Sequence, residues 1–221
     1  MSTFKTTCAR DCYDSCGMIV TTEKNEIISI KGDAEHPVTK GFLCPRGTKD
    51  IQRLNTNRIQ YPSIKEGANF NKISWQSAIK IISEKLQTTI SKFGAEKVLY
   101  LDYSGNEGLY NNIFAKRLWY SLGATFTAGA LCTASGHEAI NLHYGSSYGV
   151  QPTELPNKKL IVFWGFNAAV NAPHFWKLAL EAKKNNKAKI VVIDPIKTLS
   201  AKKADLFIQI YPGTDTALAY S

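Results

Sequence analysis

No run of apolar residues in the 221-residue sequence approaches the roughly 20 needed to cross a bilayer. The sequence also lacks a secretory signal and a twin-arginine motif near Met1, so we expect a cytoplasmic protein without direct membrane insertion. Cysteine is scarce, and its odd count of five tells against a disulfide framework. No G-x-G-x-x-G motif occurs, so the usual dinucleotide fingerprint is absent.

The overall composition is that of an ordinary globular chain. Hydrophobic residues make up 44% and charged residues 20%, and the length suits one sizeable domain with or without a small one. The net charge of +9 invites a nucleic-acid partner. The lysines are dispersed, however, and the densest set, between Lys177 and Lys203, falls in an expected helix and loop. Solvated faces account for them, and we expect no nucleic-acid partner.

Four of the five cysteines stand in one pattern. Cys8, Cys12, Cys16 and Cys44 are spaced C-x3-C-x3-C-x27-C. A soft metal centre needs several thiolates that converge on one point, and a tight loop can supply three of them. Structural zinc usually takes two compact C-x-x-C-like pairs, and Cys44 has no near partner. An iron–sulfur cluster of the [4Fe–4S] type is the leading interpretation, with zinc and a disulfide framework as alternatives.

Residues 1–57 are expected to form a small β-rich module around that metal. A strand over 3–8 leads into the cysteine loop, and a hairpin turns at Lys24-Asn25. A short helix over 45–55 carries Pro45 in its first turn. A module of this size can hardly bury a core alone.

Residues 58–221 are expected to form an α/β domain. A polar connector over 56–72 precedes a helix over 75–92 that is capped by Ser74. Further elements are expected as strands at 98–103, 160–164, 190–193 and 206–210, an extended piece at 126–127, and helices at 108–121 (after Gly105), 134–144 and 174–185. Apolar runs between helices predict parallel strands covered on both faces, hence a doubly wound, mostly parallel sheet.

Polar residues and glycines follow three of the expected strands. They are Gly165 and Asn167 after the first, Asp194 after the second, and Gly213, Thr214 and Asp215 after the third. A glycine lets the backbone approach a phosphate, and a strand-end carboxylate can bond a ribose hydroxyl. Because ligands of such sheets bind at the carboxyl ends of strands, these residues predict a nucleotide site.

These motifs together resemble one family. The cysteine pattern with Cys44-Pro45-Arg46-Gly47 resembles the iron–sulfur segment of the molybdopterin oxidoreductases, the dimethyl-sulfoxide-reductase family of formate dehydrogenases and nitrate reductases. Trp164-Gly165-Phe166-Asn167 resembles its W-G-x-N-P element, with Ala168 in place of proline. Pro212-Gly213-Thr214-Asp215 resembles its P-G-T-D element, and Asp194-Pro195 its Asp-Pro-Arg element, with Ile196 in place of arginine.

The resemblance implies a molybdenum bis(molybdopterin guanine dinucleotide) cofactor beside the [4Fe–4S] cluster. It places Arg46 between cluster and pterin, and it makes Cys132, in a loop entering a helix, the protein ligand of molybdenum. By itself, a lone cysteine is more typical of a small buried hydrophobe. The implied chemistry is two-electron redox on a small-molecule substrate, as in anaerobic respiration, with electrons passing to an iron–sulfur partner subunit.

One rival function and one expectation about length remain. A cluster-carrying subunit related to the large subunit of NADH dehydrogenase would share the fold without molybdenum, whereas a radical enzyme that uses S-adenosylmethionine fits the closed four-cysteine pattern less well. The expected α/β domain stops soon after Gly213, with a covering helix just begun. We therefore expect the N-terminal part of a longer enzyme, inactive on its own.

Overall fold

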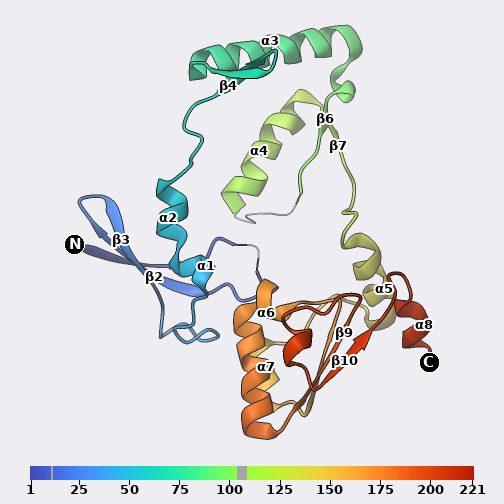
Figure 1. The fold of residues 1–221 in the computed structure, drawn as a ribbon. Coiled ribbons are helices and arrows are strands. Elements are labelled where there is room, and N and C mark those ends of the chain that lie inside the picture. The colour runs from blue at the N-terminus through green and yellow to red at the C-terminus, as the bar shows by residue number, and fades with distance from the viewer. Residues whose placement is uncertain (11, 104–108) are drawn as a thin grey trace. The chain divides into compact units, whose positions relative to one another are not determined.

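The computed structural model describes residues 1–10, 12–103 and 109–221 (Figure 1). Gly105, expected before a helix, lies outside the described residues. Contacts between residues divide the chain into two compact units, Met1–Ile51 with Tyr148–Ser221 (unit 1) and Gln52–Ser147 (unit 2). None of the described helices has the length and apolar character that crossing a membrane requires.

Unit 1 begins with a three-stranded antiparallel sheet. Strands β1 (Ser2–Thr7), β2 (Gly17–Glu23) and β3 (Glu26–Gly32) pair in that order. Lys24 and Asn25 have φ values of 48° and 65°, the left-handed pair that a two-residue hairpin turn requires. The predicted strand and hairpin are confirmed.

The helix predicted over 45–55 is present in two pieces. Helix α1 (Pro45–Thr48) is followed by its C-cap residue, Lys49, and then by α2 (Asp50–Asn55). The chain reaches α1 by folding back closely on β3, because a Cβ at Gly32 would lie 2.1 Å from the carbonyl oxygen of Gly41. Only glycine permits this approach, which brings the segment before α1 against the sheet.

The second part of unit 1 is a parallel sheet. Strands β8 (Leu160–Trp164), β9 (Lys189–Asp194) and β10 (Leu206–Gln209) lie in the order β10-β9-β8. The long helix α7 (Pro173–Asn186) connects β8 to β9. The shorter helices are η2 (Pro152–Asn157), α6 (Ala168–Asn171), η3 (Ala201–Lys203) and α8 (Asp215–Ala219). The predicted α/β class is confirmed.

The core of unit 1 lies between this sheet and α7. Ile190 and Val192 of β9 have no exposed surface, and neither do Ala179 and Ala182 of α7. The small alanine side chains let the helix backbone come close to the central strand. Tight contact of this kind makes the core sensitive to the loss of even a few methylene groups.

Strand β8 is less buried than the sequence predicts. Ile161 and Phe163 are buried, whereas Leu160, Val162 and Trp164 on the other face are 59%, 48% and 39% exposed. The expectation that both faces are covered is therefore wrong for β8 in the described chain. A continuous apolar run fits both environments, so the sequence pattern alone cannot distinguish them.

In unit 2, the segment expected as a polar connector is a hairpin. Strands β4 (Ser63–Glu66) and β5 (Asn69–Lys72) pair antiparallel across a turn at Gly67, whose φ is 61°. The prediction of a polar connector did not include these two strands. The strands carry only two large apolar residues, Ile64 and Phe70, so hydrophobic alternation was too sparse to reveal them.

The helices of unit 2 agree with their predicted positions. They are α3 (Trp75–Phe93), α4 (Leu109–Leu122) and α5 (Ala134–Tyr144), with a short η1 (Ala95–Lys97). The hydroxyl oxygen of Ser74 accepts the backbone N–H of Ser77 at 3.1 Å, which confirms the predicted cap of α3.

The strand expected over 98–103 is much shorter. Only β6 (Leu99–Tyr100) pairs, in parallel with β7 (Thr125–Phe126). Leu99 and Leu101 are 60% and 67% exposed, so the expectation of a buried strand is wrong. A strand can extend only as far as its neighbour provides residues to pair with, and β7 provides two, Thr125 and Phe126.

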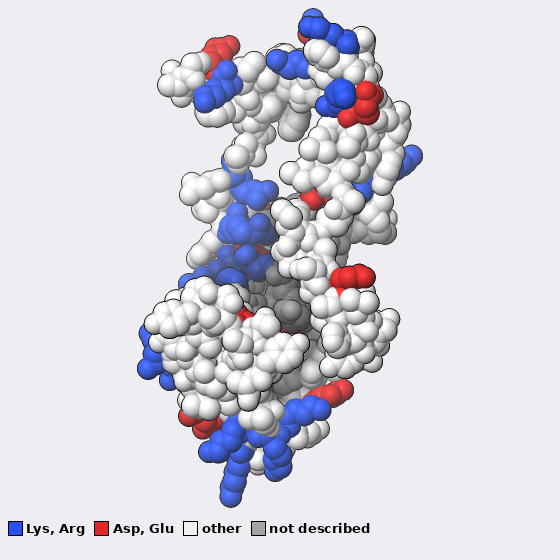
Figure 2. All heavy atoms as spheres, turned by 90° about the vertical axis from the view of Figure 1, so that its right-hand side faces the viewer, with Lys and Arg blue, Asp and Glu red and all other residues white. Residues whose placement is uncertain are grey.

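The lysines between Lys177 and Lys203 are mostly exposed, as their expected solvated role requires. Figure 2 shows basic side chains gathered at the end of unit 1 where α7 finishes. Acidic neighbours accompany some of them. Lys177 pairs with Glu181 at 3.5 Å, and Lys183 pairs with Asp205 at 3.0 Å.

The core of unit 1 yields a stability prediction. Ile190→Ala removes a side chain with no exposed surface, and we expect a loss of about 2–5 kcal/mol in the free energy of unfolding. Ile196→Ala is the matched control, because Ile196 is 68% exposed, and its loss should stay below about 0.5 kcal/mol. Urea denaturation measures both; equal losses would contradict this placement of the core.

Candidate metal centre and strand-end site

The four patterned cysteines line one pocket of unit 1. Cys8 follows β1, Cys16 precedes β2, and Cys44 is the residue before α1. The loop that holds Cys12 is closed by the backbone N–H of Cys8, which donates to the carbonyl oxygen of Cys16 at 2.8 Å. Three thiols therefore come from one short loop, and a distant segment supplies the fourth.

The donor set is that of a soft metal centre. Within residues 1–10, 12–103 and 109–221, no three metal-ligating side chains lie close enough together to hold a single metal ion. The four thiols nonetheless face one pocket. In a cluster each iron takes one cysteine, so four thiols around a shared space fit a group of several irons.

Burial controls the protonation of these thiols. Burial, together with the nearby charges of Asp14 and the other cysteines, raises the pKa of Cys16 to about 12. Burial also raises the pKa of Cys12. Without a cation in the pocket these two side chains stay protonated at neutral pH, so metal binding must release their protons.

Asp14 ties the cysteine loop to α7. Its carboxylate is 3% exposed and accepts the backbone N–H groups of His174 at 3.0 Å and Phe175 at 3.1 Å. The thiol of Cys12 also donates to it, at 3.5 Å. Burial acts to raise the pKa of Asp14, but the hydrogen bonds from His174 and Cys12 outweigh it and hold the pKa below its usual value. The carboxylate is therefore charged at neutral pH.

Arg10 joins the same loop to the segment after Cys44. Its guanidinium donates to the carbonyl oxygen of Arg46 at 3.1 Å and to the carboxylate of Asp50 at 2.5 Å. The Asp50 carboxylate is buried, whereas the Arg10 side chain is 33% exposed, so this pair is partly shielded from water. The contact holds the fourth cysteine beside the first three.

Arg46, expected between cluster and pterin, lies beside the four thiols. It lines their pocket and donates from its guanidinium to the carbonyl oxygen of Val170 in α6. The thiol of Cys12 lies 3.3 Å from the carbonyl oxygen of the next residue, Asn171. The cysteine pocket is thus joined to the segment that follows β8.

The strand-end residues gather at one edge of the parallel sheet. Since β8, β9 and β10 are neighbours and parallel, their carboxyl ends meet at the same edge. The indole Nε1–H of Trp164, at the end of β8, donates to Asp215 at 2.7 Å. The side-chain amide of Gln209 donates to the carbonyl oxygen of Pro195 at 2.9 Å. These bonds link all three strand ends.

The candidate side chains at this edge also shape their own loops. Gly165 has a φ of 61°, a conformation that residues with a Cβ rarely adopt. The side-chain oxygen of Asn167 accepts the hydroxyl of Ser200 at 2.9 Å, and Asp194 accepts the backbone N–H of Ile196 at 3.0 Å. Gly213 and Thr214 lie in a turn before α8, where the hydroxyl of Thr214 donates to the carbonyl oxygen of Tyr211 at 2.7 Å.

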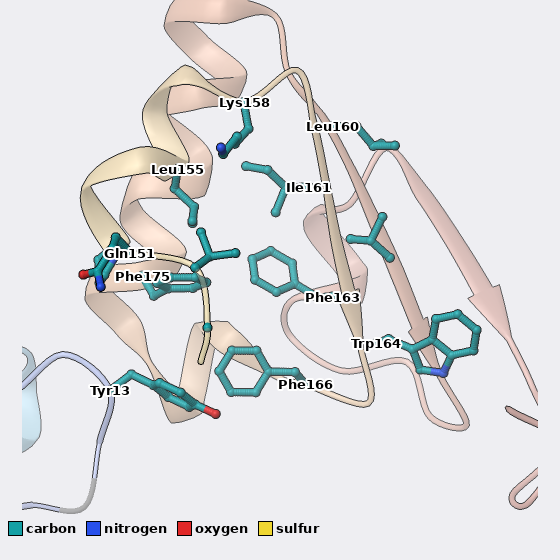
Figure 3. Close-up of a pocket in the computed structure, with 14 residues that line it drawn as sticks. Tyr13, Gln151, Leu155, Lys158, Leu160, Ile161, Phe163, Trp164, Phe166 and Phe175 are labelled. Atoms are coloured by element: carbon teal, nitrogen blue, oxygen red, sulfur yellow. The ribbon is translucent and has the colours of Figure 1, made fainter. Parts of the chain in front are cut away.

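An apolar pocket with a cavity volume of about 730 Å³ runs beside β8. Figure 3 shows Phe163, Phe166 and Phe175 around it, with Tyr13 of the cysteine loop at its rim. The rings of Tyr13 and Phe166 meet edge to face, 5.6 Å between centroids. The pocket thus connects the cysteine loop with the residues that follow β8.

Cys132 belongs to unit 2. It is exposed, in the loop before α5, and its backbone N–H donates to the hydroxyl of Tyr103 at 3.0 Å. The buried environment typical of a lone cysteine is therefore not its environment here. Exposure leaves the thiol accessible to a ligand.

Sequence reasoning missed the charged residues that anchor the cysteine loop. Asp14 and Arg10 lie between the cysteines, and a charged residue within such a loop was the available signal. His174, 2% exposed, gave no signal, because a histidine in the first turn of an amphipathic helix is usually on the surface. Its Nδ1 lies 3.7 Å from the carboxylate of Asp14.

Comparison with protein families gives two matches. Residues 1–56 match the family model described as molybdopterin oxidoreductase Fe4S4 domain, and residues 58–221 match the model described as molybdopterin oxidoreductase. Together the two matches take in nearly the whole chain.

Individual relatives are similar over almost the full chain. "Probable oxidoreductase YoaE" of Bacillus subtilis is 36% identical over 98% of this chain and 32% of its own length. A nitrate reductase of Shewanella frigidimarina is 32% identical over 99% of this chain and 24% of its own length. The chain spans a third or less of these curated relatives.

A formate dehydrogenase and a solved structure extend the comparison. The alpha subunit of the F420-dependent formate dehydrogenase of Methanocaldococcus jannaschii is 30% identical over 94% of this chain and 30% of its own length. Acetylene hydratase from Pelobacter acetylenicus superposes with a TM-score of 0.72, covering 97% of this chain and 30% of its own at 24% identity. At that identity the superposition shows the fold alone.

The cysteine environments predict an order of chemical reactivity. In metal-free protein at pH 8, we expect iodoacetamide to modify exposed Cys132 at least about tenfold faster than Cys16, whose raised pKa suppresses the thiolate. Raising the pH towards the pKa of Cys16 should speed its modification. Peptide mass spectrometry over time measures both rates, and equal rates at pH 8 would contradict the burial of Cys16.

Proposed function

The chain belongs to the molybdopterin oxidoreductase family, and we propose that it holds a [4Fe–4S] cluster and part of a molybdenum bis(molybdopterin guanine dinucleotide) cofactor. In this proposal it passes electrons between molybdenum and a redox partner. One observation carries the proposal. Four cysteines and Arg46 line a single pocket, which hydrogen bonds join to the segment after β8.

The proposed cluster ligands are Cys8, Cys12, Cys16 and Cys44. When bound, the cluster supplies one-electron transfer and the molybdenum group supplies two-electron redox chemistry. The loop fixes three thiols, and Arg10 keeps the segment of Cys44 beside them through its bonds to Arg46 and Asp50. Arg46 brings a permanent positive charge to the pocket, which favours electron density there.

The proposed nucleotide half-site is the carboxyl edge of the parallel sheet. Gly165 gives a ligand phosphate close access to the backbone. Asp194, Thr214 and Asp215 supply oxygen atoms for sugar and base, and Asn167 shapes the loop through Ser200. The hydrogen bond between Trp164 and Asp215 links the carboxyl end of β8 to the segment after β10, so that one ligand can contact both.

The proposed protein ligand of molybdenum is Cys132. Its thiol is exposed in a loop before α5, and Tyr103 supports that loop through the backbone. In this proposal residues 1–57 form the cluster module, and residues 58–221 contribute the molybdopterin-binding α/β domain. The substrate is a small redox molecule, and the electron partner is an iron–sulfur subunit.

The first test is metal and sulfide analysis of anaerobically purified chain. We expect about four irons and four sulfides per chain, and loss of most of both in Cys44→Ser, because each iron takes one cysteine. Cys132→Ser is the matched control and should keep the iron and sulfide. One zinc without sulfide would overturn the cluster.

Molybdenum content separates the enzyme from an electron-transfer subunit without molybdenum. Protein produced with the cofactor available should retain molybdenum, and Cys132→Ala should retain at least about tenfold less, since it lacks the proposed ligand. Iron in the same samples provides the internal control. Iron without molybdenum in the unaltered chain would favour the subunit related to NADH dehydrogenase.

Guanosine diphosphate tests the strand-end site directly. Since the indole N–H of Trp164 is bonded to Asp215, its NMR resonance should shift as the nucleotide is added. Trp75, the first residue of α3, is the internal control and should not shift. Equal shifts of both resonances, or none at Trp164, would argue against this site.

A further inference from the structure

Asp14 is a buried carboxylate placed against one of the four cysteines. It is 3% exposed, and the thiol of Cys12 lies 3.5 Å from one of its oxygens. Cysteine binds a metal as the thiolate. In the metal-bound protein the negative charge of Cys12 therefore faces the negative charge of Asp14. Two negative charges side by side in a buried site destabilise the folded protein unless other groups stabilise them.

The compensation comes from α7. Two backbone N–H groups at its start, those of His174 and Phe175, donate to the two oxygens of Asp14 at 3.0 and 3.1 Å. Helix α7 runs for 14 residues, so its N-terminus also carries a favourable partial positive charge. The carboxylate thus fixes the position of the loop between Cys12 and Cys16 relative to the parallel sheet.

Few other groups near Asp14 can neutralise or screen its negative charge. The imidazole of His174 is 2% exposed, and its Nδ1 stands 3.7 Å from Asp14 and has no hydrogen-bond partner among the described residues. The ring of His174 packs against Phe42, two residues before Cys44, with 5.3 Å between centroids. Little water can enter this contact, so the charge of Asp14 is weakly screened at the cysteines.

We propose that Asp14 is a positioning residue that holds the cysteine loop on α7 and lowers the reduction potential of the group bound by the four thiolates. The inference rests on the proposed function, because it requires a redox group in the pocket. Each reduction adds one electron, which dithionite supplies in the experiment, and no covalent bond forms or breaks. A fixed negative charge beside a ligand opposes that added electron.

The variants separate charge from shape. Asp14→Asn keeps the size and one acceptor oxygen but removes the charge, and Asp14→Glu keeps the charge on a longer side chain. Asp33→Asn is the matched control. Asp33 is 8% exposed in the same module and accepts the backbone N–H of Glu35 at 3.0 Å. Its carboxylate pairs with Lys5 at 3.4 Å rather than with a cysteine or α7.

The measurement is a redox titration of the anaerobic 221-residue chain, followed by electron paramagnetic resonance, with iron and sulfide assayed in each sample. In Asp14→Asn we expect a positive shift equivalent to about tenfold in the ratio of reduced to oxidised cluster, about 59 mV for one electron. Asp14→Glu should stay nearer the original potential while binding less iron. Asp33→Asn should change neither quantity.

Each outcome decides the proposal. Full iron content and an unchanged potential in Asp14→Asn would overturn it, as would an equal shift in Asp33→Asn. If Asp14→Asn stays folded by circular dichroism but loses its iron while Asp33→Asn keeps it, the positioning role is supported; loss in both variants overturns it. Absence of iron and sulfide from the unaltered chain is a separate result, which refutes the proposed function itself.

Discussion

A buried carboxylate joins two parts of unit 1 that are distant in sequence. Asp14 accepts backbone N–H groups 160 and 161 residues further along the chain, at the start of α7. The antiparallel module could not bury a core by itself, and this contact, with that of Arg46 and Val170, attaches it to the parallel sheet. The position of the four thiols relative to the strand ends depends on these contacts.

The electrostatics of the cysteine pocket follow from that attachment. Acidic and basic side chains from different elements surround thiols whose pKa values burial raises. Arg46 adds a positive charge and Asp14 a negative one, each held by hydrogen bonds to backbone groups of the other part of unit 1. A metal group in this pocket therefore meets fixed charges, which is how proteins tune such centres.

Much of this arrangement could be predicted from local sequence signals. Lys24-Asn25 specified a hairpin, Ser74 specified a helix start, and apolar runs specified β8, β9 and β10, because each signal depends on neighbouring residues alone. The cysteine spacing likewise predicted convergence. The hairpin around Gly67 was missed because its strands have little hydrophobic alternation, and the exposure of Leu99 was missed because an apolar run does not say what covers it. The contacts of Asp14 and His174 could not be predicted, since they depend on how distant elements pack.

Strand β8 has a consequence for handling the protein. It ends the described parallel sheet, and its five residues, Leu160–Trp164, are all apolar and uncharged. Edge strands of this composition are templates for intermolecular pairing, and proteins usually protect them with charges, prolines or a covering element. Concentrated solutions of this chain should therefore be prone to β-type self-association through Leu160–Trp164. Val162→Lys, which places a charge at the centre of the strand on a side chain that is 48% exposed, should oppose it.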